Sequence, residues 1–248
     1  MTTIYIMWLR EMKKFFRNSS RIIGALGQPI LFLLALGYGL GSVFQAAGQG
    51  NYIEFLAPGV IGMSIIFGSV FNGMALIWDR QFGFLKETLV APVSRTNIML
   101  GRTLGGATTA ALQGIIVLVI SLLFGFHPAS WGLVVPAVLV MLLIGLLFNA
   151  IGLTGGALFS DFQGFQLIMN FLVMPLFFLS GSLFPLQGAP TALQWIARFD
   201  PLSYGIDALR ALLINTTVYG VWSDVGILAL VTVFFLGLSS YFFSRIQI

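Results

Sequence analysis

The sequence predicts an all-α membrane protein with six transmembrane helices, an N-terminal amphipathic interfacial helix and short re-entrant outer helices between the fifth and sixth spans. Of its 248 residues, 58% are hydrophobic and 8% are charged, whereas soluble domains are roughly 45–50% apolar and about 25% charged. The apolar residues also gather in repeated runs of ~20, the length that a helix needs to cross the hydrocarbon core. The bilayer is therefore the expected solvent, and residues 1–248 are interpreted as a single transmembrane domain.

Residues 4–21 predict a basic amphipathic helix in the membrane interface, because apolar and basic side chains recur on opposite helical faces. The apolar face holds Tyr5, Trp8, Leu9, Met12, Phe15 and Phe16, and the basic face holds Arg10, Lys13, Lys14 and Arg17. A signal peptide is the alternative interpretation. The apolar run that follows, 22–44, is longer than the ~7–15 residues of a signal peptide's apolar region, so we expect no cleavage.

Six apolar runs predict the transmembrane spans. They cover residues 22–44, 57–78, 103–126, 131–159, 165–183 and 222–243. Six spans leave both termini on one side of the membrane, and that side then carries every basic residue except Arg198 and Arg210. Because cytoplasmic segments carry the excess of Lys and Arg, both termini are expected to be cytoplasmic.

The predicted spans hold polar residues but no charge in their interiors. These residues are Asn72, Gln113, Asn149, Thr154, Asn170 and Ser180. Hydrogen bonding between helices is their favoured role, and contact with a substrate is the less favoured one. Gly101 and Gly105, four residues apart, match a pattern of close helix packing, as do Gly152 and Gly156.

The longest charged interruption, residues 79–102, predicts a cytoplasmic loop, since its basic residues outnumber its acids. Apolar residues recur in it at helical spacing until Pro92, which predicts a short amphipathic helix that meets a soluble partner. The apolar positions are Phe82, Leu85 and Leu89, and the charged ones are Arg80, Lys86 and Glu87. A solvated loop whose charges only set the topology is equally consistent with this spacing.

Residues 184–221, between the last two spans, predict two short outer helices. Thr191 and Gln194 have the spacing of a capping box, and Asp200-Pro201 supplies an N-cap followed by proline at the first helical position. The second helix, 201–215, is too short to cross the bilayer and too apolar for water. We therefore expect re-entrant helices in the outer leaflet, with simple interfacial helices as the alternative. Asp207 and Arg210 are expected to form a pair.

Several chemistries are excluded by residues that the sequence lacks. It has no cysteine, a single histidine (His127) and scattered carboxylates, so no catalytic or metal site is expected. It contains no phosphate-binding GxxxxGK[ST] loop, so energy for transport must come from another subunit. The net charge of +4 follows from the membrane topology and predicts no nucleic-acid binding. A scaffold that recruits a cytosolic partner and a passive channel remain alternatives to transport.

Three segments, together with the six spans and the N-terminal helix, resemble the membrane subunit of ABC-2 type exporters over essentially the whole chain. They are Glu87–Ser94 (ETLVAPVS), Leu179–Pro185 (LSGSLFP) and Asp200–Arg210 (DPLSYGIDALR). The most specific motif is Pro-Leu-x-Tyr followed by Arg six residues after the Tyr. The compact form is similar to permeases of the daunorubicin-resistance and polysaccharide-export type.

The resemblance implies a homodimer in the bacterial or archaeal plasma membrane that works with two copies of a cytoplasmic ABC ATPase subunit. ATP and Mg would bind to the ATPase, so no cofactor is expected in this chain, and a drug, a lipid or a lipid-linked glycan would be exported. The ATPase-coupling residues would be Arg80, Phe82, Leu85, Lys86, Glu87, Leu89 and Ala91, with residues 5–17 bordering the ATPase. The outer gate would be shaped by Pro201, Tyr204, Asp207 and Arg210.

Overall fold

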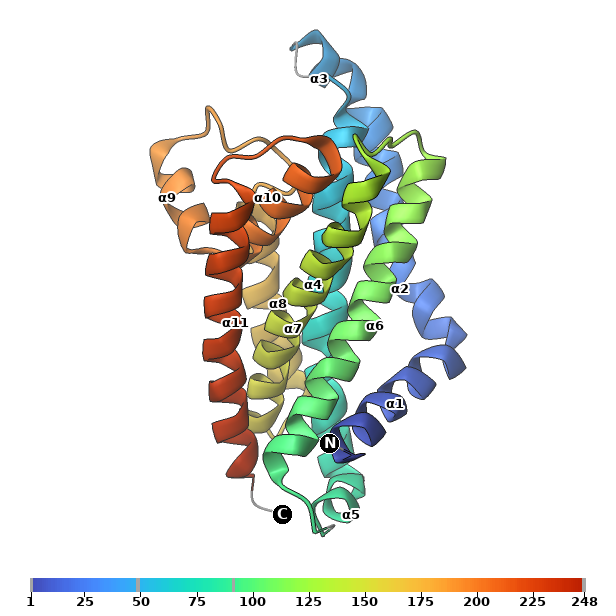
Figure 1. The fold of residues 1–248 in the computed structure, drawn as a ribbon, viewed down its shortest axis with the longest axis vertical. Helices are drawn as coiled ribbons and strands as arrows, with labels where there is room; N and C mark the ends of the chain where they lie inside the picture. The colour runs from blue at the N-terminus through green and yellow to red at the C-terminus, as the bar shows by residue number, and fades with distance from the viewer. Residues whose placement is uncertain (1, 48–49, 91, 247–248) are drawn as a thin grey trace.

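The computed structural model describes residues 2–47, 50–90 and 92–246, leaving aside the side chains of Ser19, Arg21 and Leu89. Within these residues every regular element is a helix, and the long helices run side by side in a bundle (Figure 1). The helices are α1 (Thr2–Arg17), α2 (Ser19–Phe32), the π-helix η1 (Leu33–Tyr38), α3 (Gly41–Ala46), α4 (Tyr52–Gln81), α5 (Phe84–Val90), α6 (Arg95–Leu123), η2 (Trp131–Leu133), α7 (Val134–Leu158), α8 (Phe162–Leu179), α9 (Thr191–Phe199), α10 (Pro201–Ile214) and α11 (Val221–Ser244).

Five helical runs in the described residues are long and apolar enough to cross a membrane: α4, α6, η2 with α7, α8 and α11. A sixth is reached only if α1 and residues 22–38, which are bent by 71° relative to one another, count as one span. The first predicted span, 22–44, is divided, because the helix changes to a π-helix at Leu33 and a turn at Leu40 separates it from α3. The sixfold count therefore stays a prediction.

The core lies between α4 and α7, where glycines bring the two backbones together. A Cβ atom on Gly73 would lie 2.0 Å from the carbonyl oxygen of Gly152, and one on Gly156 would lie 2.5 Å from that of Gly73. Because no side chain fits at such distances, this crossing depends on glycine. The predicted close packing at Gly152 and Gly156 is confirmed.

The helix α1 packs across α6 through the other glycine pair. A Cβ atom on Gly101 would lie 2.6 Å from that of Met7, and one on Gly105 would lie 2.7 Å from that of Glu11. The indole Nε1 of Trp8 also donates a hydrogen bond to Thr108 Oγ1 at 3.1 Å. The N-terminal helix therefore rests on the protein along one side, and it ends at Arg17, not at residue 21.

The single apolar face predicted for this helix is divided in the structure. Met12 is buried, whereas Tyr5 and Phe16 are exposed. Because α6 covers one side of α1, the helix buries some of its apolar residues within the protein and presents the others outward.

The predicted loop 79–102 is shorter than expected, because the two helices beside it extend beyond their apolar runs. The helix α4 continues to Gln81, and α6 begins at Arg95, where the side chain of Ser94 accepts a hydrogen bond from Asn97 N at 3.3 Å. Asp79 and Arg102 lie within these helices as a buried ion pair, and opposite charges in contact allow both to stay helical inside the bundle. The connecting segment is thus 82–94.

The prediction that the span interiors hold no charge needs a correction at the edges of the spans, because the Asp79–Arg102 pair lies just beyond the predicted spans 57–78 and 103–126 and Asp224 lies near the start of the predicted span 222–243. The Asp79–Arg102 pair lies within α4 and α6, and the side chain of Asp224 is fully buried in the first turn of α11. Near a helix N-terminus a carboxylate is favoured by the helix dipole, which helps the helix to carry this acid.

Candidate functional site

The predicted site residues lie at two opposite ends of the bundle. In Figure 1, α5 and the C-terminal end of α11 lie at one end, whereas α3, α9 and α10 lie at the other.

The helix α5 projects from the first end and presents mixed chemistry outward. Gly83, whose φ of +80° suits glycine, turns the chain from α4 into α5. Leu85 is only 1% exposed and packs among Met7, Leu76, Ile98 and Met99, whereas Phe82 is 72% exposed. Phe82 and Leu85 therefore do not share one face.

The remaining predicted coupling residues are placed as follows. Lys86 and Glu87 are exposed, as is Phe84, and Arg80 is half-buried near the end of α4. The side chain of Leu89 and the whole of Ala91 lie outside the described residues.

A group of charged residues joins α1, α4 and α6 just before α5. The carboxylate Oδ2 of Asp79 pairs with Arg102, and it lies 3.6 Å from the guanidinium of Arg10. Nearby, Arg95 donates hydrogen bonds to the carbonyl oxygens of Ser244 at 2.7 Å and Ile246 at 2.9 Å. These contacts tie the helix ends around α5 to one another.

The other basic residues of the N-terminal helix make fewer contacts. Lys14 pairs with Glu11 at 3.4 Å, and Lys13 and Arg17 are exposed. The structure thus brings Trp8 and Arg10 into contact with the bundle and leaves Lys13 and Arg17 on the outer surface.

At the opposite end, α10 is buried and strongly capped at its N-terminus. Asp200 accepts hydrogen bonds from Leu202 N at 2.8 Å and from Ser203 Oγ at 3.4 Å, with Pro201 in the first turn. Burial raises the pKa of Asp200 to about 7, and these hydrogen bonds oppose the rise. The predicted start of this helix is confirmed. The predicted capping box at Thr191 is wrong, because Pro190 is the N-cap of α9.

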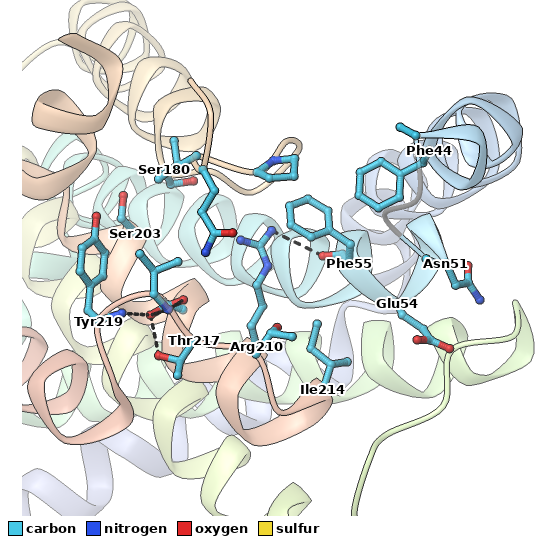
Figure 2. Close-up of a pocket in the computed structure, with 18 residues that line it drawn as sticks. Phe44, Asn51, Glu54, Phe55, Ser180, Ser203, Arg210, Ile214, Thr217 and Tyr219 are labelled. Carbon is cyan, nitrogen blue, oxygen red and sulfur yellow. Dashed lines mark hydrogen bonds between the residues drawn. The ribbon is translucent and has the colours of Figure 1, made fainter. Parts of the chain in front are cut away.

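The expected pair between Asp207 and Arg210 does not form. The carboxylate of Asp207 accepts hydrogen bonds from Thr217 Oγ1 at 3.0 Å and from the backbone N–H groups of Val218 and Tyr219, both at 2.9 Å. It therefore holds the segment between α10 and α11 against α10 (Figure 2). The hydroxyl of Thr217 and two backbone N–H groups therefore satisfy the Asp207 carboxylate, which was expected to pair with the Arg210 guanidinium.

Arg210 binds two other segments. Its guanidinium donates to the carbonyl oxygens of Gly181 at 2.8 Å and Ser182 at 3.2 Å. It also donates to the Phe55 carbonyl oxygen at 3.5 Å and lies 3.9 Å from the ring centroid of Phe55 in α4 (Figure 2). Burial lowers the pKa of Arg210 to about 10. Tyr204, one turn and a half earlier, donates from its hydroxyl to the Arg198 carbonyl oxygen at 2.7 Å.

Asp207 and Arg210 border a cavity of about 510 Å³ between α4, α10 and the outer loops (Figure 2). Its wall combines aromatic, hydroxyl, amide and charged groups. They include Phe44, Asn51, Glu54, Phe55, Ser180, Gln187, Ser203, Asp207, Arg210, Thr217 and Tyr219. Sequence reasoning missed most of them, because they come from separate segments that no motif connects.

Some polar residues of the predicted spans bond to another helix, and others bond to nearby backbone oxygens. Asn72 Nδ2 donates to Asn149 Oδ1 at 3.1 Å between α4 and α7, as predicted. Thr154 and Ser180 bond to backbone oxygens within or beside their own helices. Within the described residues, no three His, Cys, Asp or Glu side chains lie close enough together to hold a metal ion.

Comparison with known proteins gives one family and a group of relatives. Residues 2–214 match the family model described as ABC-2 type transporter. Nodulation protein J of Rhizobium leguminosarum bv. trifolii is 30% identical over 91% of this chain and 84% of that protein. The putative transport permease ycf38 of Porphyra purpurea is 32% identical over 81% and 70% of the two chains. The inner membrane transport permease YadH of Escherichia coli K12 is 29% identical over 82% and 80%.

Proposed function

Because the chain belongs to the ABC-2 type transporter family, it is the membrane subunit of a transporter, and we propose that it is the permease of an ATP-binding-cassette exporter. Two copies form the pathway for an amphiphile, and two separate ATPase subunits supply the energy. The chain lies in the inner membrane with both termini in the cytoplasm. The absence of a phosphate-binding loop from the sequence supports a separate ATPase.

The observation that carries the proposal is the surface of α5. This short helix and the turn before it present Phe84, Lys86 and Glu87 of α5 and Phe82 of the turn outward at one end of the bundle. Exposed aromatic residues beside charges are typical of protein interfaces. Asp79, near the end of α4 that leads into α5, contacts Arg10 of α1 and Arg102 of α6. A displacement of α5 by a partner would therefore be passed to α4, to which it is connected, and through Asp79 to α1 and α6.

The outer cavity supports the assignment of the other end. It lies beside α10, and Asp207 and Arg210 hold the loops that border it. We place the outer gate here, with Pro201 and Tyr204 fixing the start of α10 and Asp207 and Arg210 fixing the surrounding loops. The cargo would leave the pathway past this cavity.

Charge reversal on α5 tests the proposal. In a co-purification of the tagged permease with its ATPase subunit, Glu87→Lys should lower the recovered ATPase about tenfold or more, because a wrongly charged group at an interface repels its partner. ATP-dependent export of a fluorescent amphiphile from the same cells should fall in parallel. Membrane insertion should be unchanged, because Glu87 is exposed.

The matched control is Glu54→Lys, the same reversal at the outer cavity, which should leave ATPase recovery unchanged. Normal ATPase recovery and normal export by Glu87→Lys would remove α5 from the coupling role. A wild-type chain that recovers no ATPase subunit and exports nothing would overturn the exporter assignment as a whole.

A further inference from the structure

A second cavity, of about 220 Å³, lies between α2, α4 and α6, away from the outer cavity. It is lined by Gly24, Ala25, Gln28, Pro29, Met63, Ser64, Phe67, Gly68, Phe71 and Gln113. A much smaller space of about 20 Å³ shares Gly68 and Gln113 with it and reaches Glu11 and Lys14 on α1. We call the larger space the α2 crevice.

Gln113 is the unusual residue of the α2 crevice. Its side chain is only 6% exposed, and no hydrogen bond to its carboxamide is found among the described residues. The carboxamide is not one of their fully enclosed polar atoms that lack a partner, so it borders the open space of the crevice. The bond between helices that the sequence predicts for it is therefore absent. An amide that loses contact with water and gains no partner costs roughly 1–3 kcal/mol, so a polar group that enters the crevice can be stabilised by bonding to Gln113.

The opposite wall leaves room for this carboxamide. A Cβ atom on Gly68 of α4 would lie 2.2 Å from Gln113 Oε1, so glycine is required for the amide to occupy its position. Gly24 on α2 also lines the crevice, and a Cβ atom there would meet nothing within 4 Å, so the space beside it is open. The amide thus packs against α4 at Gly68 and borders the open space of the crevice.

The other lining groups define what could fill that space. None of the described residues that line it is charged, so it offers no counter-ion to a charged ligand. Ser64 donates its hydroxyl proton to the Ile61 carbonyl oxygen at 2.8 Å, and its oxygen can still accept. Phe67 and Phe71, stacked with ring centroids 6.2 Å apart, supply an apolar wall.

We propose that the α2 crevice binds an amphiphile through an uncharged hydrogen-bonding group, an amide, hydroxyl or ester, with Gln113 as its polar partner. The crevice is smaller than the ~300–1,000 Å³ of a site for a whole drug-sized ligand, so it holds the polar group and the adjoining part of the chain. That the amphiphile is the transported one rests on the proposed function, whereas a resident bilayer lipid would present the same chemistry.

The test uses the purified full chain in lipid nanodiscs and two photoreactive probes. Both carry the same diazirine-bearing alkyl chain, and one ends in a primary amide whereas the other ends in a carboxylate. The amide probe should label residues 24–29 and 63–71 at least about tenfold more than the carboxylate probe, because none of the described residues that line the crevice carries a positive charge to compensate a carboxylate.

Two variants locate the binding. Gln113→Leu should lower labelling by the amide probe roughly three- to tenfold, the value of one neutral hydrogen bond with a buried partner. Gly24→Phe should abolish labelling by filling the crevice from its open side. Gln166→Leu, on the exposed surface of α8, is the matched control and should label like wild type.

Equal labelling by the two probes, or wild-type labelling in both Gln113→Leu and Gly24→Phe, would overturn the proposal. Thermal unfolding in the same nanodiscs confirms that each variant is folded. Addition of the ATPase subunit with ATP then distinguishes a transported amphiphile from a resident bilayer lipid. Labelling of the crevice should fall if the site binds the transported amphiphile, and it should stay unchanged if the site binds a resident lipid. Since the labelling itself needs no ATPase, failed export would leave this result unaffected, and failed labelling would leave the exporter assignment in place.

Discussion

The helices α5 and α10 are both short segments at the ends of the bundle, but their surroundings are opposite. Of the predicted coupling side chains that are described on and beside α5, Leu85 is buried and Phe82, Lys86 and Glu87 are exposed. In α10, nearly every side chain is buried, and its N-cap Asp200 is bonded to the first turn. Contacts within the chain thus determine where α10 lies, whereas the apolar and charged side chains on and beside α5 remain exposed to solvent.

This difference indicates what each end does. A helix buried on all sides by its own chain transmits changes from the segments that it contacts, as α10 contacts α4, α7 and α11. An exposed helix with aromatic side chains gains its remaining contacts from a partner. Substitutions in α10 and beside α5 should therefore differ in their effect on the free energy of unfolding.

The largest effect is expected for Arg210→Met. The change removes the donor of two buried carbonyl groups, those of Gly181 and Ser182, and an unpaired buried acceptor costs about 1–3 kcal/mol. Unfolding followed by circular dichroism in detergent should show a loss of about 2–4 kcal/mol. Arg198→Met is the control, because Arg198 is exposed, and it should cost less than about 1 kcal/mol. Equal losses in the two variants would mean that Arg210 does not hold the outer loops.

A smaller, pH-dependent effect is expected from Asp200. Because burial raises its pKa in the folded chain to about 7, from 3.8, the folded state holds the proton more tightly than the unfolded state between these values. Its contribution to stability is therefore fully present below pH ~4 and is lost as the pH rises through about 7, by up to about 1.4 kcal/mol per pH unit.

Melting temperatures measured from pH 5 to 8 check this sign. Asp200→Asn keeps an N-cap acceptor and should flatten the dependence in that range. A wild-type protein whose melting temperature rises between pH 5 and 7 while the variant stays flat would contradict the assignment to Asp200.

The smallest effect on stability is expected for Phe82→Ser beside α5. Its ring is exposed, so unfolding should change by less than about 0.5 kcal/mol, while the affinity for the ATPase subunit in a pull-down should fall severalfold. Leu85→Ala, three residues away, should instead cost about 2–4 kcal/mol, because Leu85 is buried among Met7 and Leu76. Similar losses of stability in both variants would remove the distinction between the two sides of α5.

The sequence by itself determined the features that depend on composition and on neighbouring residues. Long apolar runs indicated membrane helices, and five of the six correspond to helices that are long enough to cross. The start of α10 was predictable because a cap and its helix are adjacent in sequence: Asp200 bonds to Leu202 N, two residues away. The glycine pairs of α6 and α7 were detectable because their spacing of four places them on one helical face.

The tertiary structure alone decided which polar groups meet. Asp207 and Arg210 have the spacing of a pair, yet their partners lie in Val218 and Gly181, because those segments bring backbone donors and acceptors closer. The ends of α4 and α6 depended on contact between Asp79 and Arg102, and Gln113 borders a cavity instead of bonding to a side chain of a neighbouring helix. Spacing along a helix determines which side chains share a face. What each side chain binds is determined by the other segments that pack against that face.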